Sequence, residues 1–134
     1  MLETRRLNSK DKVIITASLT GAVTTKKDNP NLPTQPEEIC ESALRCYEAG
    51  AAVVHIHVRD EQDNASMRFD IFEKTVGLIK KTGCPVLLNL TSSGGQGFSW
   101  EERIKPFQVL KPELASFDAG TMNWLNKVVF MNEP

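Results

Sequence analysis

The stretch Ala52-Val53-Val54-His55-Ile56-His57-Val58-Arg59-Asp60 decides the fold, because its run of β-branched and apolar residues predicts a buried strand. Successive side chains of a strand point to opposite faces of its sheet. His55 and His57 are therefore expected to enter one space, while the aliphatic residues beside them face the other way. The chain has only 2 histidines, and both lie here.

Two histidines at this spacing predict part of a metal site. Imidazole is a common zinc ligand, and a catalytic zinc site typically combines three protein ligands with one open position for water or substrate. His55 and His57 would supply two of the three. The alternative is that the rings are hydrogen-bonded core residues, or line a pocket that holds no metal.

Strand and helix patterns alternate on both sides of this stretch. Apolar runs predict strands over residues 13–19, 52–58, 86–90 and 114–117. Helical spacing and capping-box signals at residues 34–37 and 99–102 predict helices over about 36–49, 69–79 and 99–110. This alternation requires a parallel sheet covered by helices, either doubly wound or a (β/α) barrel.

The glycine pattern favours the barrel. The loop after the first strand lacks G-x-G-x-x-G, and Gly94-Gly95-Gln96-Gly97 does not match a Walker A sequence. Polar clusters also follow the predicted strands, at residues 20–21, 55–60, 91–95 and 116–123. Catalytic groups of (β/α)8 barrels lie at the carboxyl ends of the strands.

The length predicts about four of the eight units of such a barrel. A complete (β/α)8 barrel takes roughly 250 residues, and the chain has 134. We therefore expect residues 1–134 to be the N-terminal half of one barrel domain, truncated at the C-terminus. Its last strand would present unpaired backbone groups, which favours a homo-oligomer and predicts that these residues alone are catalytically inactive.

The composition is that of an ordinary soluble protein. The net charge is -1 and charged residues make up 25% of the chain, so neither nucleic acid nor a membrane is an expected partner. The charged start of the chain is unlike a secretory signal, which favours the cytoplasm. The three cysteines, Cys40, Cys46 and Cys84, form no C-x-x-C pair and are expected to be reduced and without a chemical role.

An ordered set of motifs from about residue 12 to residue 134 resembles the β-keto acid cleavage enzyme family, typified by the 3-keto-5-aminohexanoate cleavage enzymes. The motifs are Thr20-Gly21-Ala22, Asn29-Pro30-Asn31-Leu32-Pro33, Pro36-Glu37-Glu38-Ile39, Glu48-Ala49-Gly50-Ala51, His55-Ile56-His57-Val58-Arg59-Asp60, Ser92-Ser93-Gly94-Gly95, Lys111-Pro112-Glu113-Leu114-Ala115-Ser116 and Gly120-Thr121-Met122-Asn123-Trp124.

The resemblance implies a zinc-dependent (β/α)8 barrel enzyme. Such an enzyme condenses a β-keto acid with acetyl-CoA and yields acetoacetate and a new acyl-CoA by retro-Claisen cleavage. It implies that His55 and His57 bind zinc, and that Thr91, Gly94 and Ser116 hold the carboxylate and neighbouring oxygens of the keto acid. The third zinc ligand, a glutamate, would lie beyond Pro134, as would the catalytic base and an arginine.

One position departs from the aminohexanoate enzymes of this family. Val23 stands where they are expected to have a glutamate that meets the substrate's amino group. Valine cannot pair with an ammonium, and leaving that cation desolvated would be costly. We therefore expect a β-keto acid without the amino group.

Two further sets of charged residues need an interpretation. Arg59 and Asp60 follow the histidine strand and are expected to brace loops. Asp118 is a candidate to orient one of the imidazoles without binding metal. A rival function is a barrel metal-dependent hydrolase, although those enzymes usually carry H-x-H on the first strand, not the second.

Overall fold

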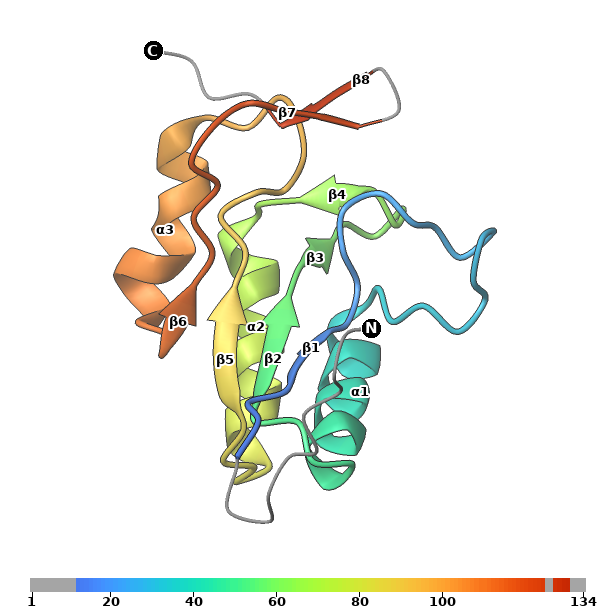
Figure 1. Ribbon diagram of the computed structural model, residues 1–134, viewed down its shortest axis with the longest axis vertical. Helices are drawn as coiled ribbons and strands as arrows, with labels where there is room; N and C mark the ends of the chain where they lie inside the picture. Colours follow the sequence, from blue (N-terminus) through green and yellow to red (C-terminus); the bar gives the residue numbers. More distant parts are fainter. Residues whose placement is uncertain (1–11, 125–126, 131–134) are drawn as a thin grey trace, which may run out of the picture.

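The computed structural model describes residues 12–124 and 127–130, and its centre is a parallel sheet. The strands are β1 (Thr16–Ser18), β2 (Val53–Ile56), β5 (Leu87–Leu90) and β6 (Leu114–Ala115). They lie in the order β1-β2-β5-β6, and each neighbouring pair is parallel. Figure 1 shows them side by side. The predicted parallel sheet is confirmed.

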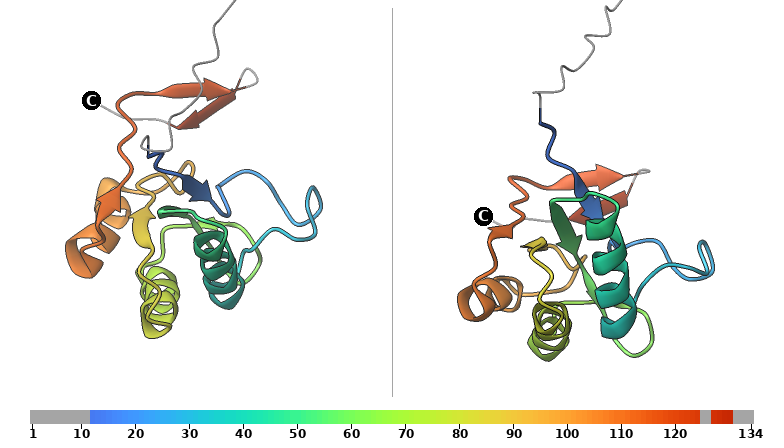
Figure 2. Two further views of the ribbon diagram at one scale, coloured as in Figure 1. Left: turned by 60° about the horizontal axis from the view of Figure 1, so that its bottom comes forward. Right: turned by 90° about the horizontal axis from the view of Figure 1, so that it is seen from below.

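Three helices connect these strands. They are α1 (Pro36–Glu48), α2 (Phe69–Lys81) and α3 (Trp100–Leu110). All three lie on the same side of the sheet, as the two views of Figure 2 show. Helix α2 contacts both α1 and α3. Each helix therefore carries the chain from one parallel strand to the next, which is the repeating unit of a (β/α) barrel.

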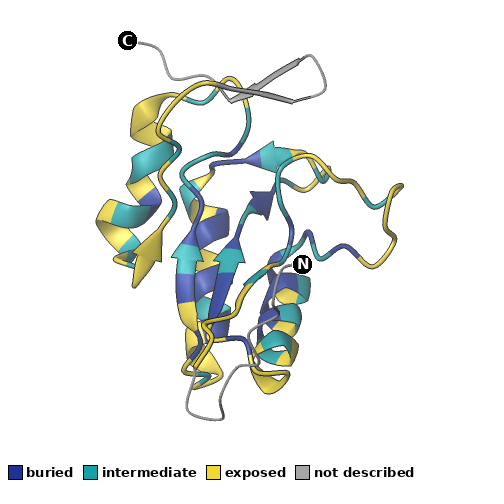
Figure 3. Ribbon diagram, in the orientation of Figure 1, coloured by how far each residue is buried: buried dark blue, intermediate teal, exposed yellow. Residues whose placement is uncertain are grey.

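The core lies between the sheet and the helices. Val54 of β2 pairs in register with Leu88 of β5, and Ile56 pairs with Leu90. All four are buried, and they belong to one cluster with apolar residues of α1 and α2 such as Ile39, Phe72, Val76 and Ile79. Figure 3 shows the contrast between these buried elements and the largely exposed α3 and β6. The histidines therefore belong to the opposite face of the sheet, as predicted from the alternation.

The two predicted helix starts had different outcomes. At α3, Ser99 Oγ accepts the Glu102 N–H and Glu102 Oε2 accepts the Ser99 N–H, which is the predicted capping box. At α1 the predicted start at Pro36 is confirmed, but the predicted capping box was wrong by one residue, because Gln35 and not Thr34 is the N-cap. Glu38, not Glu37, accepts the Gln35 N–H at 3.1 Å.

The first predicted strand was too long. Only Thr16–Ser18 is a strand, and Val13, Ile14 and Ile15 are exposed instead of buried. β1 lies at the edge of the described sheet, where only one flank has a neighbouring strand. Apolar residues are therefore not enough to predict burial for a segment at the edge of a sheet.

The second predicted strand ends earlier than expected, because the chain leaves the parallel sheet at His57. Residues Val58–Arg59 form β3, which pairs antiparallel with β4 (Ala65–Ser66). The turn between them is held by Asp60, whose carboxylate accepts the N–H groups of Gln62 and Asn64. A second antiparallel pair, β7 (Met122–Trp124) and β8 (Lys127–Phe130), was also not predicted.

Candidate active site

The candidate site lies where the parallel strands end. His57 follows β2, Thr91 follows β5 and Ser116 follows β6. The Thr91 N–H donates to the Ile56 carbonyl and the Ser116 N–H donates to the Leu90 carbonyl, so the backbones remain adjacent past the strand ends. The topology thus brings three of the predicted polar segments to one edge of the sheet, the edge that carries the chemistry of parallel α/β folds.

The two imidazoles share one space. The ring centroids of His55 and His57 lie 4.9 Å apart, and the ring planes are inclined by 76°. Both side chains are partly buried. His55 Nδ1 lies 3.1 Å from Oδ1 of Asn89, a residue on the neighbouring strand β5.

His57 is held neutral by its surroundings. Burial, together with smaller contributions from the nearby His55 and Arg59, lowers the pKa of His57 to about 4. At neutral pH this imidazole therefore keeps a nitrogen lone pair, which a metal ligand must have.

These residues fit two positions of a zinc site. Imidazole nitrogens are donors that zinc accepts, and the two rings lie side by side. Within residues 12–124 and 127–130, no group of three or more histidine, cysteine, aspartate or glutamate side chains is arranged to hold a metal ion. The described residues therefore supply two of the three protein ligands that a catalytic zinc site typically has.

The loop after β5 is shaped by Thr91. Its buried hydroxyl donates to the Ser93 carbonyl and accepts the Ser93 N–H, each at 3.0 Å. The hydroxyl proton of Thr91 is therefore used inside the loop. Thr91 can accept one more hydrogen bond from a ligand, but its evident role is to fix the backbone around Ser93 and Gly94.

Ser116 joins the fourth strand to this loop. Its Oγ accepts the Ser92 N–H at 3.0 Å. The Ser116 hydroxyl proton has no acceptor among the residues that the structure describes, so it remains available to a ligand oxygen. The Ser92 carbonyl in turn accepts a hydrogen bond from Arg103 Nε of α3 at 2.8 Å. The loop is thus fixed from two directions.

Gly94 is required by close packing. A Cβ atom at this position would lie 2.5 Å from Met67 Cγ, 2.7 Å from Met67 Sδ and 3.1 Å from Phe98 Cε2. We expect Gly94→Ala to lower the free energy of unfolding by about 1–3 kcal/mol, because the added methyl group overpacks this contact. Urea denaturation followed by circular dichroism measures the change.

The matched control is Gly77→Ala in α2. A Cβ there has no neighbouring atom within 4 Å. Alanine is favoured over glycine in a helix by up to about 1 kcal/mol, so this variant should be unchanged or more stable. Equal unfolding free energies for the two variants would show that Gly94 is not tightly packed.

Arg59 braces loops, as predicted, but through carbonyl groups. It is only 3% exposed, and its guanidinium donates to the backbone oxygens of Gly21, Thr24 and Asp63 at 2.9 to 3.1 Å. Burial lowers the pKa of Arg59. The segment that carries Val23 is therefore fixed to Arg59, which lies two residues after His57.

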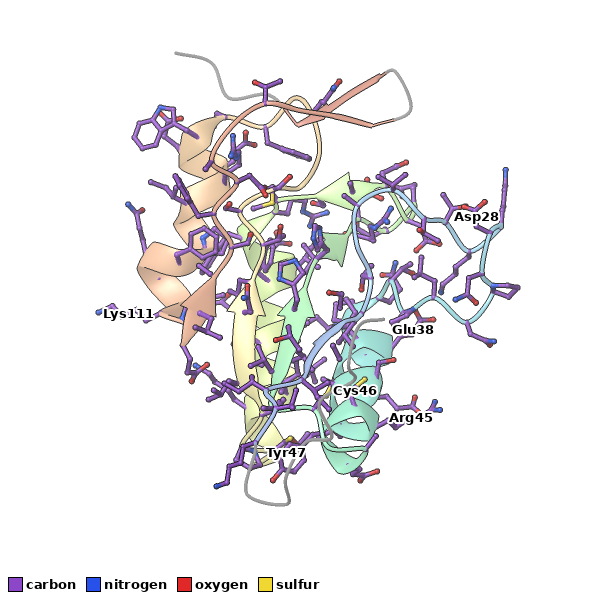
Figure 4. All side chains as sticks on the ribbon, viewed as in Figure 1. Asp28, Glu38, Arg45, Cys46, Tyr47 and Lys111 are labelled. Atoms are coloured by element: carbon purple, nitrogen blue, oxygen red, sulfur yellow. The ribbon has the colours of Figure 1, made fainter. Side chains whose placement is uncertain are left out.

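Val23 itself lies on the surface of the described structure, with 78% of its area exposed. The long loop around it is closed at its base, where Thr20 Oγ1 donates to the Pro33 carbonyl at 2.8 Å. Lys26 Nζ donates to the Glu38 carboxylate at 2.7 Å. Figure 4 shows Asp28 at the outer part of this loop and Glu38 at the start of α1.

The three cysteines are free thiols, with Cys40 buried.

The side-chain partner of His55 is Asn89, which was not predicted from the sequence. An asparagine inside an otherwise aliphatic strand was the available signal, because asparagine is depleted in strands. The role of Asp118 stays a prediction. None of the helices in the described part of the chain has the length and apolar character needed to cross a lipid bilayer.

Comparison with known proteins finds matches over most of the chain. The model of the family described as "beta-keto acid cleavage enzyme" matches residues 12–134. The 3-keto-5-aminohexanoate cleavage enzyme of Acetoanaerobium sticklandii is 42% identical over 123 residues, which cover 91% of this chain and 44% of that protein. The 3,5-dioxohexanoate:acetyl-CoA acetone transferase of Paraburkholderia graminis is 38% identical over 87% of this chain and 37% of that protein.

A solved structure shows the same fold. The ternary complex of ObcA with a C4-CoA adduct and oxalate superposes with a TM-score of 0.68 at 27% identity, over 78% of this chain and 27% of that one. The predicted barrel-type α/β fold class is thereby confirmed. The chain spans less than half the length of each of these relatives.

Proposed function

The chain belongs to the β-keto acid cleavage enzyme family, and we propose that the full-length protein is a zinc-dependent enzyme that cleaves a β-keto acid with acetyl-CoA as co-substrate. The carbon–carbon bond between C2 and C3 of the keto acid breaks. Its acyl group passes to the CoA sulfur, and its carboxymethyl part joins the acetyl group to leave as acetoacetate. The pair of adjacent imidazoles at the strand ends carries this proposal.

His55 and His57 would hold the zinc ion. Both rings lie in one space, and His57 is neutral at physiological pH. Zinc bound there would polarise the ketone oxygen as a Lewis acid. A zinc ion there would lie near the start of the loop at residues 91–95, because the Thr91 N–H donates to the carbonyl of Ile56, which lies between the two histidines. The ketone and the carboxylate of one small substrate would then reach both.

Thr91, Gly94 and Ser116 would bind the carboxylate. Ser116 has a hydroxyl proton to donate, and Thr91 fixes the backbone that presents the N–H groups near Gly94. Packing of Gly94 against Met67 keeps this part of the loop in place. Fixed hydroxyl and N–H donors suit a small anion, because they need no reorganisation when it binds.

The test is an assay of acetoacetate formation by the full-length protein with a panel of β-keto acids. Activity that requires both acetyl-CoA and zinc supports the proposal. Consumption of the substrate without acetyl-CoA would favour a metal-dependent hydrolase instead. Zinc content measured on the same preparation separates an inactive metal-free sample from a wrong assignment.

The substrate is proposed to be a β-keto acid with an uncharged tail. Val23 offers no charge to an ammonium, and the named substrate of the Paraburkholderia graminis relative, 3,5-dioxohexanoate, carries no amino group. Arg59 holds the backbone on both sides of Val23, so this side chain belongs to a fixed part of the loop.

Val23→Glu is expected to change this preference. The ratio of kcat/KM for 3-keto-5-aminohexanoate to kcat/KM for an uncharged analogue should rise about 10- to 100-fold, the effect of one new hydrogen bond between charged groups. Steady-state kinetics with both substrates measure the ratio. Thr24→Glu places the same charge one residue further and should leave the ratio unchanged. An equal kcat/KM ratio in the two variants would show that the residue at position 23 does not contact the substrate's amino group.

The proposal extends to the setting of the enzyme. We infer a cytoplasmic homo-oligomer that uses small-molecule substrates only. Size-exclusion chromatography with light scattering on the full-length protein tests the oligomeric state.

A further inference from the structure

We propose that Asn89 is a positioning residue that sets the tautomer of His55 and so decides which imidazole nitrogen is offered to the metal. This inference rests on the proposed metal site for its consequence, but the tautomer itself can be measured without metal. Four observations on β2 and β5 lead to it.

The backbone places the two residues side by side. β2 and β5 are parallel neighbours, and His55 is the register partner of Asn89. Register partners on adjacent strands point to the same face of a sheet. The residues before and after them, Val54 with Leu88 and Ile56 with Leu90, are buried against the helices. His55 and Asn89 therefore share the face that also carries His57.

The contact has a direction. His55 Nδ1 lies 3.1 Å from Asn89 Oδ1, and an amide oxygen can only accept a hydrogen bond. In the neutral form of the ring, this contact therefore places the proton on Nδ1. Nε2 is left with its lone pair, the form in which a histidine binds metal.

The position of Asn89 in its strand points the same way. The other three residues of β5 are leucines, and asparagine is depleted in strands. Among the residues that the structure describes, its one side-chain partner is the His55 ring. A role in setting the tautomer of His55 explains why a polar side chain stands among these leucines.

The neighbouring ring makes the choice of nitrogen matter. The His57 ring stands edge-on to the His55 ring, with centroids 4.9 Å apart. Both rings would have to direct a lone pair at the same point to bind one metal ion. If His55 carried its proton on Nε2, the only lone pair of the ring would be on Nδ1 and would face the side-chain oxygen of Asn89. The Asn89 bond excludes that arrangement.

The experiment compares Asn89→Leu with Asn89→Asp in the full-length protein. Leucine removes the acceptor and keeps a similar volume, whereas aspartate keeps an acceptor oxygen. Nitrogen-15 chemical shifts of labelled histidines in the metal-free protein report the tautomer. Zinc affinity is measured by competition with a chromophoric chelator. Asn31→Leu, on the exposed loop before α1, is the matched control.

The expected result has two parts. Asn89→Leu should shift the His55 signals away from the Nδ1–H tautomer and weaken zinc binding about 10- to 100-fold. Asn89→Asp should retain both the tautomer and the affinity, and Asn31→Leu should change neither. Unchanged nitrogen-15 shifts in Asn89→Leu would overturn the inference. If the shifts change but even the wild type binds no zinc, the tautomer role is supported and the proposed metal site fails.

Discussion

His57→Ala in the full-length protein is expected to abolish stoichiometric zinc binding and to lower the rate of acetoacetate formation by about 10³-fold. The His57 imidazole is neutral at physiological pH and lies beside the His55 ring, and alanine removes it as a ligand. Metal polarisation of a carbonyl is worth several kcal/mol, and about 4 kcal/mol corresponds to this factor. Zinc content by atomic emission and kcat/KM with acetyl-CoA measure the two effects.

The double variant His55→Ala/His57→Ala provides the sharper test. If both rings act through one metal ion, the first substitution already removes the whole effect, so the double variant should be no slower than either single variant within a few-fold. Multiplied losses in the double variant, or full zinc content in a single variant, would mean that the histidines work separately.

The sequence predicted the histidine pair and the strand–helix order because both depend on local periodicity. Alternation alone places His55 and His57 on one face. The capping box at Ser99 was predictable because its partners lie three residues apart. These are short-range features, which a single sequence contains in full.

Other parts of the site depend on register and tertiary contacts. Asn89 meets His55 only because β5 pairs with β2 in one particular register, and the two residues are 34 positions apart. The break of the strand at His57 depends on the hairpin closed by Asp60. The exposure of Val13, Ile14 and Ile15 depends on which strand lies at the edge of the sheet. No local pattern contains this information.

Arg59→Met is expected to have the largest effect on stability, lowering the free energy of unfolding by about 3 kcal/mol. Methionine keeps much of the buried volume but donates nothing, so the carbonyls of Gly21, Thr24 and Asp63 lose their partner. A hydrogen bond to a charged group is worth about 1.5–3 kcal/mol, and a buried acceptor left unpaired adds to the loss. Urea denaturation measures the change, and hydrogen exchange at residues 20–25 reports loosening of the loop that carries Val23.

Arg68→Met is the matched control, and it separates burial from charge pairing. Arg68 forms ion pairs with two carboxylates, Glu61 and Asp70, whereas Arg59 donates only to carbonyl oxygens. Counting ion pairs would predict the larger loss at Arg68. Its side chain is exposed, however, and exposed pairs contribute about 0–1 kcal/mol because water competes for both partners. A loss at Arg59 no greater than that at Arg68 would mean that the carbonyl contacts do not hold the loop. A larger loss, with faster exchange at residues 20–25, identifies Arg59 as the link between the histidine strand and the loop of Val23.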